Sequence, residues 1–258
     1  MSPRRKDPFI PGPEAKPYSK KAVNRAGKLL GEFFYTPVPD GKGPFGDFDA
    51  DSVIEAMFAV TWWKQQHAVP LSRVAAGLRY HVAKENGQVN DRIDVAQRLK
   101  KRDTIINKMR RHKTMQLTTM HDIGGARATL PSVDHVYSVS RRLKKTWTIT
   151  KTRDYIAEPK PTGYRAIHHE VKRDGVVIEV QLRSMLQHAW ANQVEDDGRA
   201  LGTGYKFGFG IDDVHAYYET MGRVFAVLDR GEKIPDDLQD ELRSRYAKIE
   251  HILPRGKK

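Results

Sequence analysis

A two-residue turn, Asp174-Gly175, constrains the fold of this chain more than any other short segment. It separates two runs rich in β-branched and apolar residues, and an Asp-Gly pair between such runs is the strongest local signal for a β-hairpin. The second run alternates strictly, with Ile178, Val180 and Leu182 apolar and Glu179, Gln181 and Arg183 polar. Since the side chains of a strand alternate between its two faces, one face is predicted to be apolar. The other then carries carboxylate, amide and guanidinium groups together.

The polar face of this hairpin has two interpretations. A row of polar side chains is common on the solvated face of an antiparallel sheet. The segment before the turn, however, adds Lys160, Tyr164 and His168 to the same short hairpin. A cation, a phenol and an imidazole beside the polar row of the second strand favour a binding site over a solvated face.

Apolar residues at helical spacing predict several helices outside the hairpin. Residues 19–34 combine an N-cap candidate, Ser19, with an apolar stripe at helical spacing. A second helix is predicted to begin at Asp51 or Ser52, and a third runs from an N-cap at Asp103 through Arg111. Further helices are predicted over residues 133–143, 211–229 and 236–250. Strands are predicted over residues 123–130 and around Trp147 and Ile149, whereas residues 74–82 fit either a strand or a short helix.

Two segments are predicted to lie outside the regular elements. Residues 1–17 are rich in proline and poor in apolar side chains, which is typical of a disordered or extended tail. Residues 201–210 form a glycine-rich stretch with Tyr205, Phe207 and Phe209. This stretch lacks the GK[ST] ending of a phosphate loop. Stacking on bases and a mobile loop anchored by its aromatic rings both stay open for it.

The charge of the chain is strongly positive and unevenly distributed. Lysine and arginine number 45 against 32 acidic residues, for a net charge of +13. Residues 98–113 hold eight basic residues and one acid, and residues 141–153 hold six basic residues and no acid. Concentrated positive charge indicates a polyanionic partner such as a nucleotide, a nucleic acid or an anionic lipid. A solubilising surface is the alternative, and charge alone does not choose between ATP and RNA.

Several classes of protein are excluded by composition. The chain has 258 residues, enough for one sizeable core with a small appendage. No apolar run approaches the roughly 20 residues that span a membrane, and the N-terminus lacks the apolar region of a secretory signal. Cysteine is absent, which removes disulfides and thiolate metal sites and fits a reducing compartment. We therefore expect a cytoplasmic protein without a membrane partner.

The segments PKPTGYRAIH, IEVQLRS and QHAWA, in this order, resemble the synthetase domain of the RelA/SpoT family. The resemblance runs from about Tyr18 to about Gly231. It implies an α+β fold in which a mixed β-sheet, nucleotidyltransferase-like core is flanked by helices, with N- and C-terminal helical extensions. The implied division is a flexible tail over 1–17, an N-terminal helix and linker over 18–50, a pyrophosphokinase domain over 51–200, and a glycine/aromatic loop with C-terminal helices over 201–258.

The resemblance also implies a site that binds ATP as the donor of pyrophosphate. The family's ATP-binding motif has an arginine, a lysine, a small hydroxyl residue and a lysine at the spacing of Arg98, Lys100, Thr104 and Lys108. The usual hydroxyl residue is serine, so Thr104 is a mild departure. Read without the family, the same residues fit a basic amphipathic helix that covers the core equally well. Arg127 matches the arginine of the D-x-x-G-x-R motif and is expected against the adenine.

Two carboxylates carry the implied chemistry. Asp122 begins the D-x-x-G-x-R motif and is expected to bind Mg²⁺, and Glu179 is expected to share that ion and to activate the attacking hydroxyl. Two carboxylates would repel each other without a cation, and hard oxygen ligands with phosphates favour Mg²⁺. His121-Asp122 also spells the dipeptide of HD hydrolases. We discount that interpretation, because such a site needs further ligands from a preceding helical domain.

The acceptor is expected to bind at the hairpin. Tyr164 would stack on its base, while Lys160, His168 and Gln181 would fix its phosphates and base. RelA/SpoT synthetases pyrophosphorylate GDP or GTP to make (p)ppGpp. The segments YSKKAVNRAGKLL and DDVHAYYETMGRVFAVLDRG resemble more closely the toxic small synthetases of phages and toxin–antitoxin pairs. Some of these modify the 3′-CCA end of tRNA, and others make adenosine alarmones.

The 3′-CCA end of tRNA is the expected acceptor, with a free guanine or adenine nucleotide as the alternative. His188 stands where several GDP-using members have asparagine, which puts guanine recognition in doubt. A catalytically inactive RNA-binding module is a further alternative, although two acids beside a basic nucleotide pocket argue against it. A protein antitoxin and self-association stay open as partners.

Overall fold

The fold is described from a computed structural model, which covers residues 17–36, 45–86, 94–202 and 211–253. Residues 1–16 of the predicted tail and the aromatic residues Tyr205, Phe207 and Phe209 lie outside the described residues. Within the described ranges, every helix is too short or too polar to cross a lipid bilayer.

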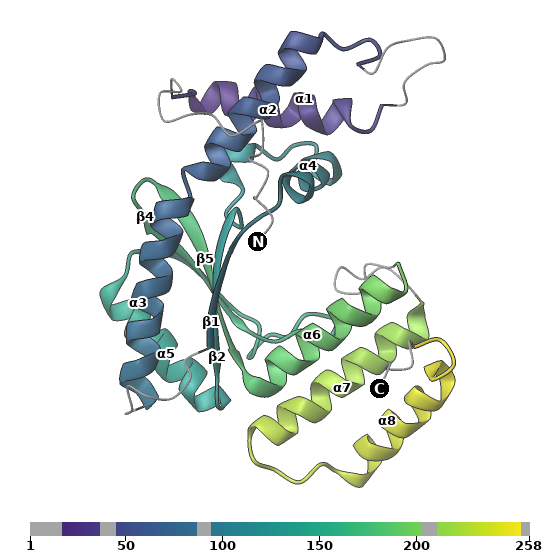
Figure 1. The fold of residues 1–258 in the computed structure, drawn as a ribbon. Helices are drawn as coiled ribbons and strands as arrows, with labels where there is room; N and C mark the ends of the chain where they lie inside the picture. The colour runs from purple at the N-terminus through teal and green to yellow at the C-terminus, as the bar shows by residue number, and fades with distance from the viewer. Residues whose placement is uncertain (1–16, 37–44, 87–93, 203–210, 254–258) are drawn as a thin grey trace, which may run out of the picture. The chain divides into compact units, whose positions relative to one another are not determined.

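Helices lie at both ends of the described chain, and the strands lie between them with further helices interspersed (Figure 1). The helices are α1 (Lys20–Phe33), α2 (Ala50–Gln65), α3 (Ala68–Asn86), α4 (Arg102–Arg111), η1 (Leu117–Thr119), α5 (Val133–Thr146), α6 (Met185–Ala200), α7 (Asp212–Asp229) and α8 (Asp236–Ile249). The strands are β1 (Asp94–Leu99), β2 (Gly124–Leu130), β3 (Ile149–Asp154), β4 (Ile167–Arg173) and β5 (Val176–Ser184). They form one five-stranded sheet in the order β1-β2-β5-β4-β3. The predicted α+β class, with a mixed sheet flanked by helices, is confirmed.

The predicted hairpin is confirmed by its turn geometry. Asp174 has φ 48° and Gly175 has φ 83°. Positive φ at both central residues is the requirement of a type I′ turn, whose twist matches that of the flanking strands. Side chains of β5 alternate as predicted, with Ile178, Val180 and Leu182 fully buried. Glu179 and Gln181 are only partly buried, on the opposite face.

Contacts divide the chain into two compact units, each described by itself. The first contains Met1–Val74, Gln97–Ala126 and Lys172–Glu179. In this unit α1 packs on α2 and α4 through the apolar stripes of the three helices. The buried residues of these stripes include Val23, Ala26 and Leu30 of α1, Val53 and Val60 of α2, and Ile105, Ile106 and Met109 of α4.

Two predicted helix starts in the first unit are wrong by one or two residues, and one start is confirmed. The Ser19 hydroxyl accepts a hydrogen bond from the Ala22 N–H at 3.1 Å, as expected of an N-cap. Helix α2 begins at Ala50 rather than at Asp51 or Ser52, because the Asp49 carboxylate caps it through the Ser52 N–H. Helix α4 has Lys101 at its N-cap without a side-chain bond, and Asp103 lies inside its first turn.

Helix α3 settles the open assignment of residues 74–82, which are helical. Pro70 lies in the first turn of α3, where the missing N–H has no partner inside the helix in any case. The second half of α3 belongs to the second unit, which contains Ala75–Ala96, Arg127–Val171 and Val180–Lys258. There it packs beside α5, with the Arg142 guanidinium 2.6 Å from the Glu85 carboxylate.

The predicted strand around Trp147 begins later than expected. Trp147 is the C-cap of α5, and its ring meets the His81 ring edge-on with centroids 5.6 Å apart. Strand β3 therefore starts at Ile149 and pairs antiparallel with β4. Packing of the indole between helices has overridden its preference for a strand, which is a weak preference in any sequence.

Helices α6, α7 and α8 form a second core in the second unit. Its buried members are Trp190, Val194, Val214, Tyr218, Met221 and Ile249. The predicted helices over 211–229 and 236–250 are confirmed as α7 and α8. Helix α6 was not predicted, although a capping box marks its start. The Ser184 hydroxyl and the Gln187 side chain each bond the other's backbone N–H.

His169 on β4 makes the stability of the second unit sensitive to acid. The imidazole is fully buried and bonded to the Ser140 and Thr152 hydroxyls, each at 2.9 Å. Burial lowers the pKa of His169 to about 4; the charges of Lys144 and His168 lower it further and Asp154 opposes them. The unfolded chain protonates this group near pH 6.5, so between these values the unfolded state binds more protons and stability rises with pH.

We predict that wild-type protein loses about 2 kcal/mol of unfolding free energy through His169 between pH 7.5 and pH 5. His169→Gln should remove most of this difference, because glutamine has no proton to gain. Urea unfolding at the two pH values measures it, with the exposed His112→Gln as the matched control. An unchanged pH dependence in His169→Gln would show that other groups set the acid sensitivity.

Candidate functional site

The first group of predicted site residues meets around the Asp122 carboxylate, beside α4. Lys100 follows β1 directly, and its backbone N–H donates to the Ile123 carbonyl at 2.8 Å. This backbone bond places Lys100 beside Asp122, which precedes β2. The Lys100 Nζ lies 2.8 Å from Asp122 Oδ2, and the Lys108 Nζ of α4 lies 2.9 Å from Asp122 Oδ1. One carboxylate therefore binds two lysines, one with each oxygen.

Asp122 is held ionised by these two lysines. Its side chain is 26% exposed, and those of Lys100 and Lys108 are 14% and 25% exposed. Burial raises the pKa of Asp122, but hydrogen bonds and charges from both lysines outweigh it, and the pKa lies below its usual value. The three groups leave a net positive charge at a partly open position, which suits an anionic ligand.

The other predicted donor residues have less definite surroundings. Arg98 on β1 and Thr104 in the first turn of α4 are exposed. Glu179 lies partly buried on β5, the neighbour of β2 in the sheet. Arg127 on β2 belongs to the second unit and is partly buried. The structure thus brings Lys100, Lys108 and Asp122 into direct contact, while the roles of all seven predicted donor residues stay predictions.

The residues predicted to bind the acceptor form a second group, within the second unit. The Tyr164 hydroxyl shares a 2.6 Å hydrogen bond with His168 Nε2. The Lys160 Nζ lies over the Tyr164 ring, 5.0 Å from its centroid. Gln181 joins the group through Arg183, whose Nη2 donates to Gln181 Oε1 at 2.8 Å and to the Tyr164 hydroxyl at 3.0 Å. All four predicted residues are therefore connected through side-chain contacts.

Two members of this group had no assigned role in the sequence analysis. Arg183 is 9% exposed and holds the phenol and the amide together. Arg183 continues the alternating polar row of Glu179 and Gln181 on β5, and this alternation was the signal in the sequence that could have identified it. Tyr155 packs edge-on against both Tyr164 and His168, with centroids 5.9 and 5.2 Å away, and its ring lies 4.6 Å below the Lys160 Nζ. No pattern in the sequence indicates this contact, because Tyr155 lies in an irregular loop.

His188, the noted departure from the asparagine of GDP-using members, lies on α6 and shares a 3.1 Å hydrogen bond with Asn192. Burial lowers the pKa of His188, and the charges of Arg127 and Arg183 lower it further, while Asp94 opposes them. The imidazole is therefore neutral near pH 7, beside two guanidinium groups of the same unit.

Asp122 and Glu179 are the donor residues predicted to bind a magnesium ion. Among the described residues, no three His, Cys, Asp or Glu side chains are grouped closely enough to hold a metal by themselves. Mg²⁺ is commonly bound by one or two carboxylates together with substrate phosphates. Asp122 and Glu179 supply the two carboxylates that such a site uses, and their joint binding of Mg²⁺ stays a prediction.

Residues 97–199 match a family model described as "Region found in RelA / SpoT proteins". The chain carries a RelA/SpoT region. Every predicted site residue, from Arg98 to Gln181, lies inside it, and so do Tyr155, Arg183 and His188.

Two relatives with assigned names are similar to part of this chain. GTP pyrophosphokinase YwaC of Bacillus subtilis is 32% identical over 111 residues, which cover 37% of this chain and 52% of YwaC. GTP pyrophosphokinase YjbM of the same organism is 34% identical over 109 residues, which cover 38% of this chain and 52% of YjbM. The chain thus spans about half the length of these curated relatives.

Solved structures extend the likeness of the fold beyond the RelA/SpoT region. Small alarmone synthetase 2 of Bacillus subtilis superposes with a TM-score of 0.56 at 23% identity, covering 66% of this chain and 95% of the synthetase. Small alarmone synthetase 1 of the same organism, bound to its product pppGpp, gives a TM-score of 0.54 at 25% identity, covering 70% and 96%.

We predict that Tyr164→Phe destabilises the protein by about 1–3 kcal/mol, because it removes the oxygen that accepts from the largely buried Arg183 and bonds His168. Urea unfolding at pH 7.5 measures the change. Tyr155→Phe is the matched control, because Tyr155 meets the same group through its ring. Equal stabilities of the two variants would mean that the phenol oxygen contributes nothing to the group.

Proposed function

We propose that this chain is an ATP-dependent pyrophosphokinase that transfers the β,γ-diphosphate of ATP to a ribose 3′-hydroxyl. The observation that carries the proposal is the ionised Asp122 carboxylate between Lys100 and Lys108. Lys100 lies just before α4 and Lys108 lies in its last turn, and two lysines that meet at one position are suited by their charge to a triphosphate. The names of YwaC and YjbM, both GTP pyrophosphokinases, support the same reaction.

In this proposal the lysines exchange partners when ATP binds. Lys100 and Lys108 leave the Asp122 carboxylate for the phosphates, with Arg98 and Thr104 as further contacts and Arg127 against the adenine. Asp122 and Glu179 would then hold Mg²⁺ together with the phosphates, and the bound ion would neutralise phosphate charge and align the donor. The ammonium groups of Lys100 and Lys108 also neutralise phosphate charge, and this lowers the repulsion between the phosphates and an incoming oxygen nucleophile.

The proposed transfer is a nucleophilic displacement at phosphorus. The acceptor's 3′-oxygen attacks the β-phosphorus of ATP, the bond from that phosphorus to the α,β-bridging oxygen breaks, and AMP leaves. Glu179 takes the proton of the attacking hydroxyl. Glu179 and Gln181 share one face of β5, because side chains two residues apart on a strand point the same way. This spacing lets the base stand next to a residue of the acceptor group.

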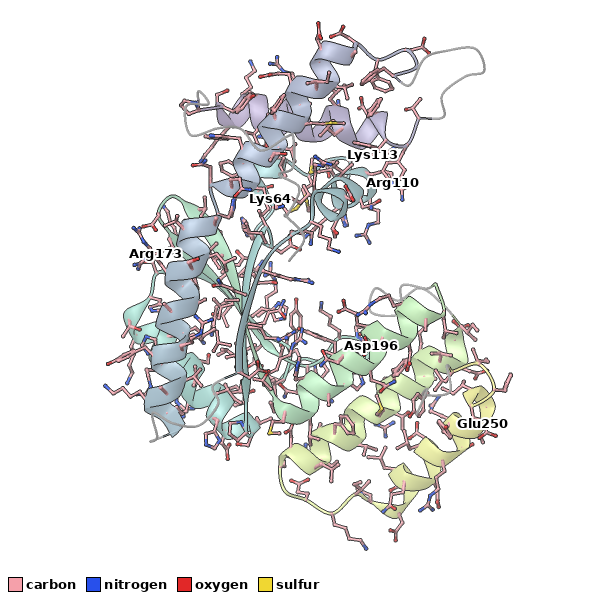
Figure 2. The ribbon with its side chains drawn as sticks, viewed as in Figure 1. Lys64, Arg110, Lys113, Arg173, Asp196 and Glu250 are labelled. Atoms are coloured by element: carbon pink, nitrogen blue, oxygen red, sulfur yellow. The ribbon has the colours of Figure 1, made fainter. Side chains whose placement is uncertain are left out.

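For the acceptor we propose a purine ribonucleotide. Tyr164 offers a ring for the base, Lys160 a cation for the phosphates, and His168 and Gln181 hydrogen-bonding groups. A free guanine nucleotide agrees with the names of the relatives. The terminal adenosine of tRNA is the second candidate, which would make the chain a toxin that halts translation. It is favoured by exposed basic side chains such as Arg110 and Lys113, at and just beyond the end of α4 (Figure 2).

The acceptor is tested with ATP labelled in the γ-phosphate, incubated with full-length protein, Mg²⁺ and GDP, GTP, ATP or deacylated tRNA. We expect label in one purine acceptor. Glu179→Gln should lower the rate by about 10²–10⁴-fold, as loss of a general base does, while ATP binding is kept. Label in tRNA would support the toxin, and label in a nucleotide would support an alarmone synthetase. Absence of label from every acceptor would contradict the proposed reaction and favour an inactive RNA-binding module.

The exchange of lysine partners makes a separate prediction about ATP binding without metal. Asp122→Asn keeps the shape of the side chain but releases both lysines, so ATP in EDTA should bind about 5- to 30-fold tighter than to the wild type. This estimate takes about 0.5–1 kcal/mol for each of two partly exposed ion pairs. Calorimetric titration measures it, and Asp134→Asn on α5 is the matched control. Weaker metal-free binding by Asp122→Asn would contradict the competition.

A further inference from the structure

The loop between β3 and β4, residues 155–166, carries two of the predicted acceptor residues and is called the acceptor loop below. A tight turn shapes it: the Gly163 N–H donates to the Lys160 carbonyl at 2.8 Å, and the Lys160 N–H donates to the Tyr164 carbonyl at 3.2 Å. Gly163 has φ 87°, which a residue with a side chain adopts only with strain. This turn places Lys160 and Tyr164 side by side.

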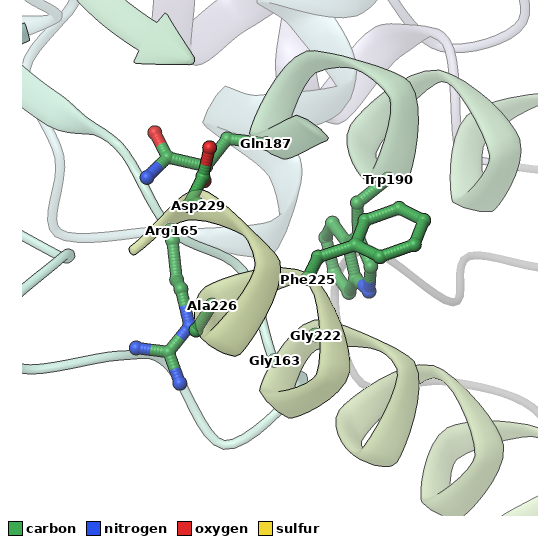
Figure 3. A pocket seen from close by; sticks show the side chains of 8 residues that line it. All are labelled: Gly163, Arg165, Gln187, Trp190, Gly222, Phe225, Ala226 and Asp229. Carbon is green, nitrogen blue, oxygen red and sulfur yellow. The ribbon is translucent and has the colours of Figure 1, made fainter. Parts of the chain in front are cut away.

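The acceptor loop touches α7 backbone against backbone. A Cβ on Gly163 would lie 2.9 Å from the Tyr218 carbonyl oxygen and from the Glu219 Cα. A Cβ on Gly222, one turn further along α7, would lie 2.7 Å from the Gly163 carbonyl oxygen. Figure 3 shows the loop at Gly163 beside the α7 turn that carries Gly222. The backbones of the loop and the helix can approach this closely because both positions lack a side chain.

Further contacts connect α7 with the acceptor group through α6 and the end of β5. Trp190 of α6 donates from its Nε1 to the Tyr218 carbonyl at 2.8 Å, while its ring meets the Tyr164 ring with centroids 6.1 Å apart. The Ser184 hydroxyl, next in the chain to Arg183, donates to Asp229 at the end of α7 at 2.6 Å. Helix α7 thus contacts both the acceptor loop and the residue that follows the end of the polar row of β5.

A small cavity lies along the same contact. It is lined by Gly163, Arg165, Gln187, Trp190, Gly222, Phe225, Ala226 and Asp229 (Figure 3). Burial raises the pKa of Asp229 against the opposing effects of Ser184 and Arg165, so removal of these partners would leave a costly buried carboxylate. The polar contacts around the cavity therefore help to keep α7 against the loop.

We propose that α7 sets the position of the acceptor loop and that Gly222 is a positioning residue for acceptor binding. The inference rests on the proposed function, because it assigns the acceptor to Lys160 and Tyr164. Gly222 itself acts through Gly163 and touches no substrate. A methyl group at position 222 would push the turn away, and displacement of binding groups by about 1 Å can cost up to about 10² in rate. The donor residues Lys100, Lys108 and Asp122 lie in the other unit and should be unaffected.

The test is Gly222→Ala in the full-length protein, with the acceptor identified by the labelling experiment. We expect the KM for the acceptor to rise on the order of tenfold, with the calorimetric Kd for ATP unchanged. Alanine favours a helix over glycine by about 1 kcal/mol, so α7 itself should not be weakened. Gly31→Ala on α1 is the matched control, because its nearest contact would be an ordinary 3.6 Å, and both constants should stay at the wild-type values.

A second variant covers the case in which Gly222→Ala does not fold. Trp190→Phe keeps a ring beside Tyr164 but removes the bond to the Tyr218 carbonyl, and the acceptor KM should rise about threefold without a change in ATP binding. An unchanged acceptor KM in folded Gly222→Ala, or in Trp190→Phe where the first variant is unfolded, would overturn the positioning role. So would an equal loss of ATP affinity. Inactivity of the wild type towards every acceptor would instead contradict the proposed function.

Discussion

The alternation of side chains along β5 is the constraint on which the rest of this structure depends. One face of the strand is buried through Ile178, Val180 and Leu182, and this burial fixes the register of the strand, because a slip by one residue would expose all three. The other face consequently presents Glu179, Gln181 and Arg183 in a fixed row. The Cα atoms of Glu179 and Arg183, four residues apart on one strand, are about 13 Å apart, at roughly 3.3 Å per residue. The same hydrophobic burial that stabilises the sheet therefore sets the spacing of its polar groups.

The two groups of site residues solve the problem of partly buried charge in different ways. In the first, Asp122 is compensated by Lys100 and Lys108, so the group is stable without a ligand and needs a competing anion to open it. In the second, the cation of Arg183 is compensated by neutral oxygens, the Tyr164 hydroxyl and the Gln181 amide. A hydroxyl and an amide oxygen carry no net charge, so these two hydrogen bonds do not neutralise the Arg183 guanidinium. Ion pairs therefore hold the first group together, whereas hydrogen bonds between side chains hold the second group together.

Much of this arrangement could be predicted from the sequence, because its signals are local. The hairpin follows from the conformational needs of Asp174-Gly175, and the apolar stripes of α1, α4 and α7 follow from helical spacing. The helix starts at Ala50 and Arg102 were misplaced because several polar residues compete as caps. Helix α6 was missed because the segment after β5 was interpreted only through its resemblance. The pairing of Lys100 and Lys108 on one carboxylate depends on distances that no spacing in the chain encodes.

The contact between the acceptor loop and α7 lies beyond sequence reasoning for a different physical reason. A glycine inside a helix costs about 1 kcal/mol relative to alanine, so Gly222 by itself indicates only a weak point in α7. Its value becomes visible once Gly163 is placed against it, since any side chain would separate the two backbones. The close contact depends on the missing side chains of Gly163 and Gly222. A missing side chain adds no apolar periodicity or charge pattern that a sequence could show. The local cost of Gly222 is offset by close packing against a loop from far earlier in the chain. Hydrogen bonds to His168 and Arg183 hold the Tyr164 side chain, whereas the contact between Gly163 and Gly222 holds the backbone of the loop against α7.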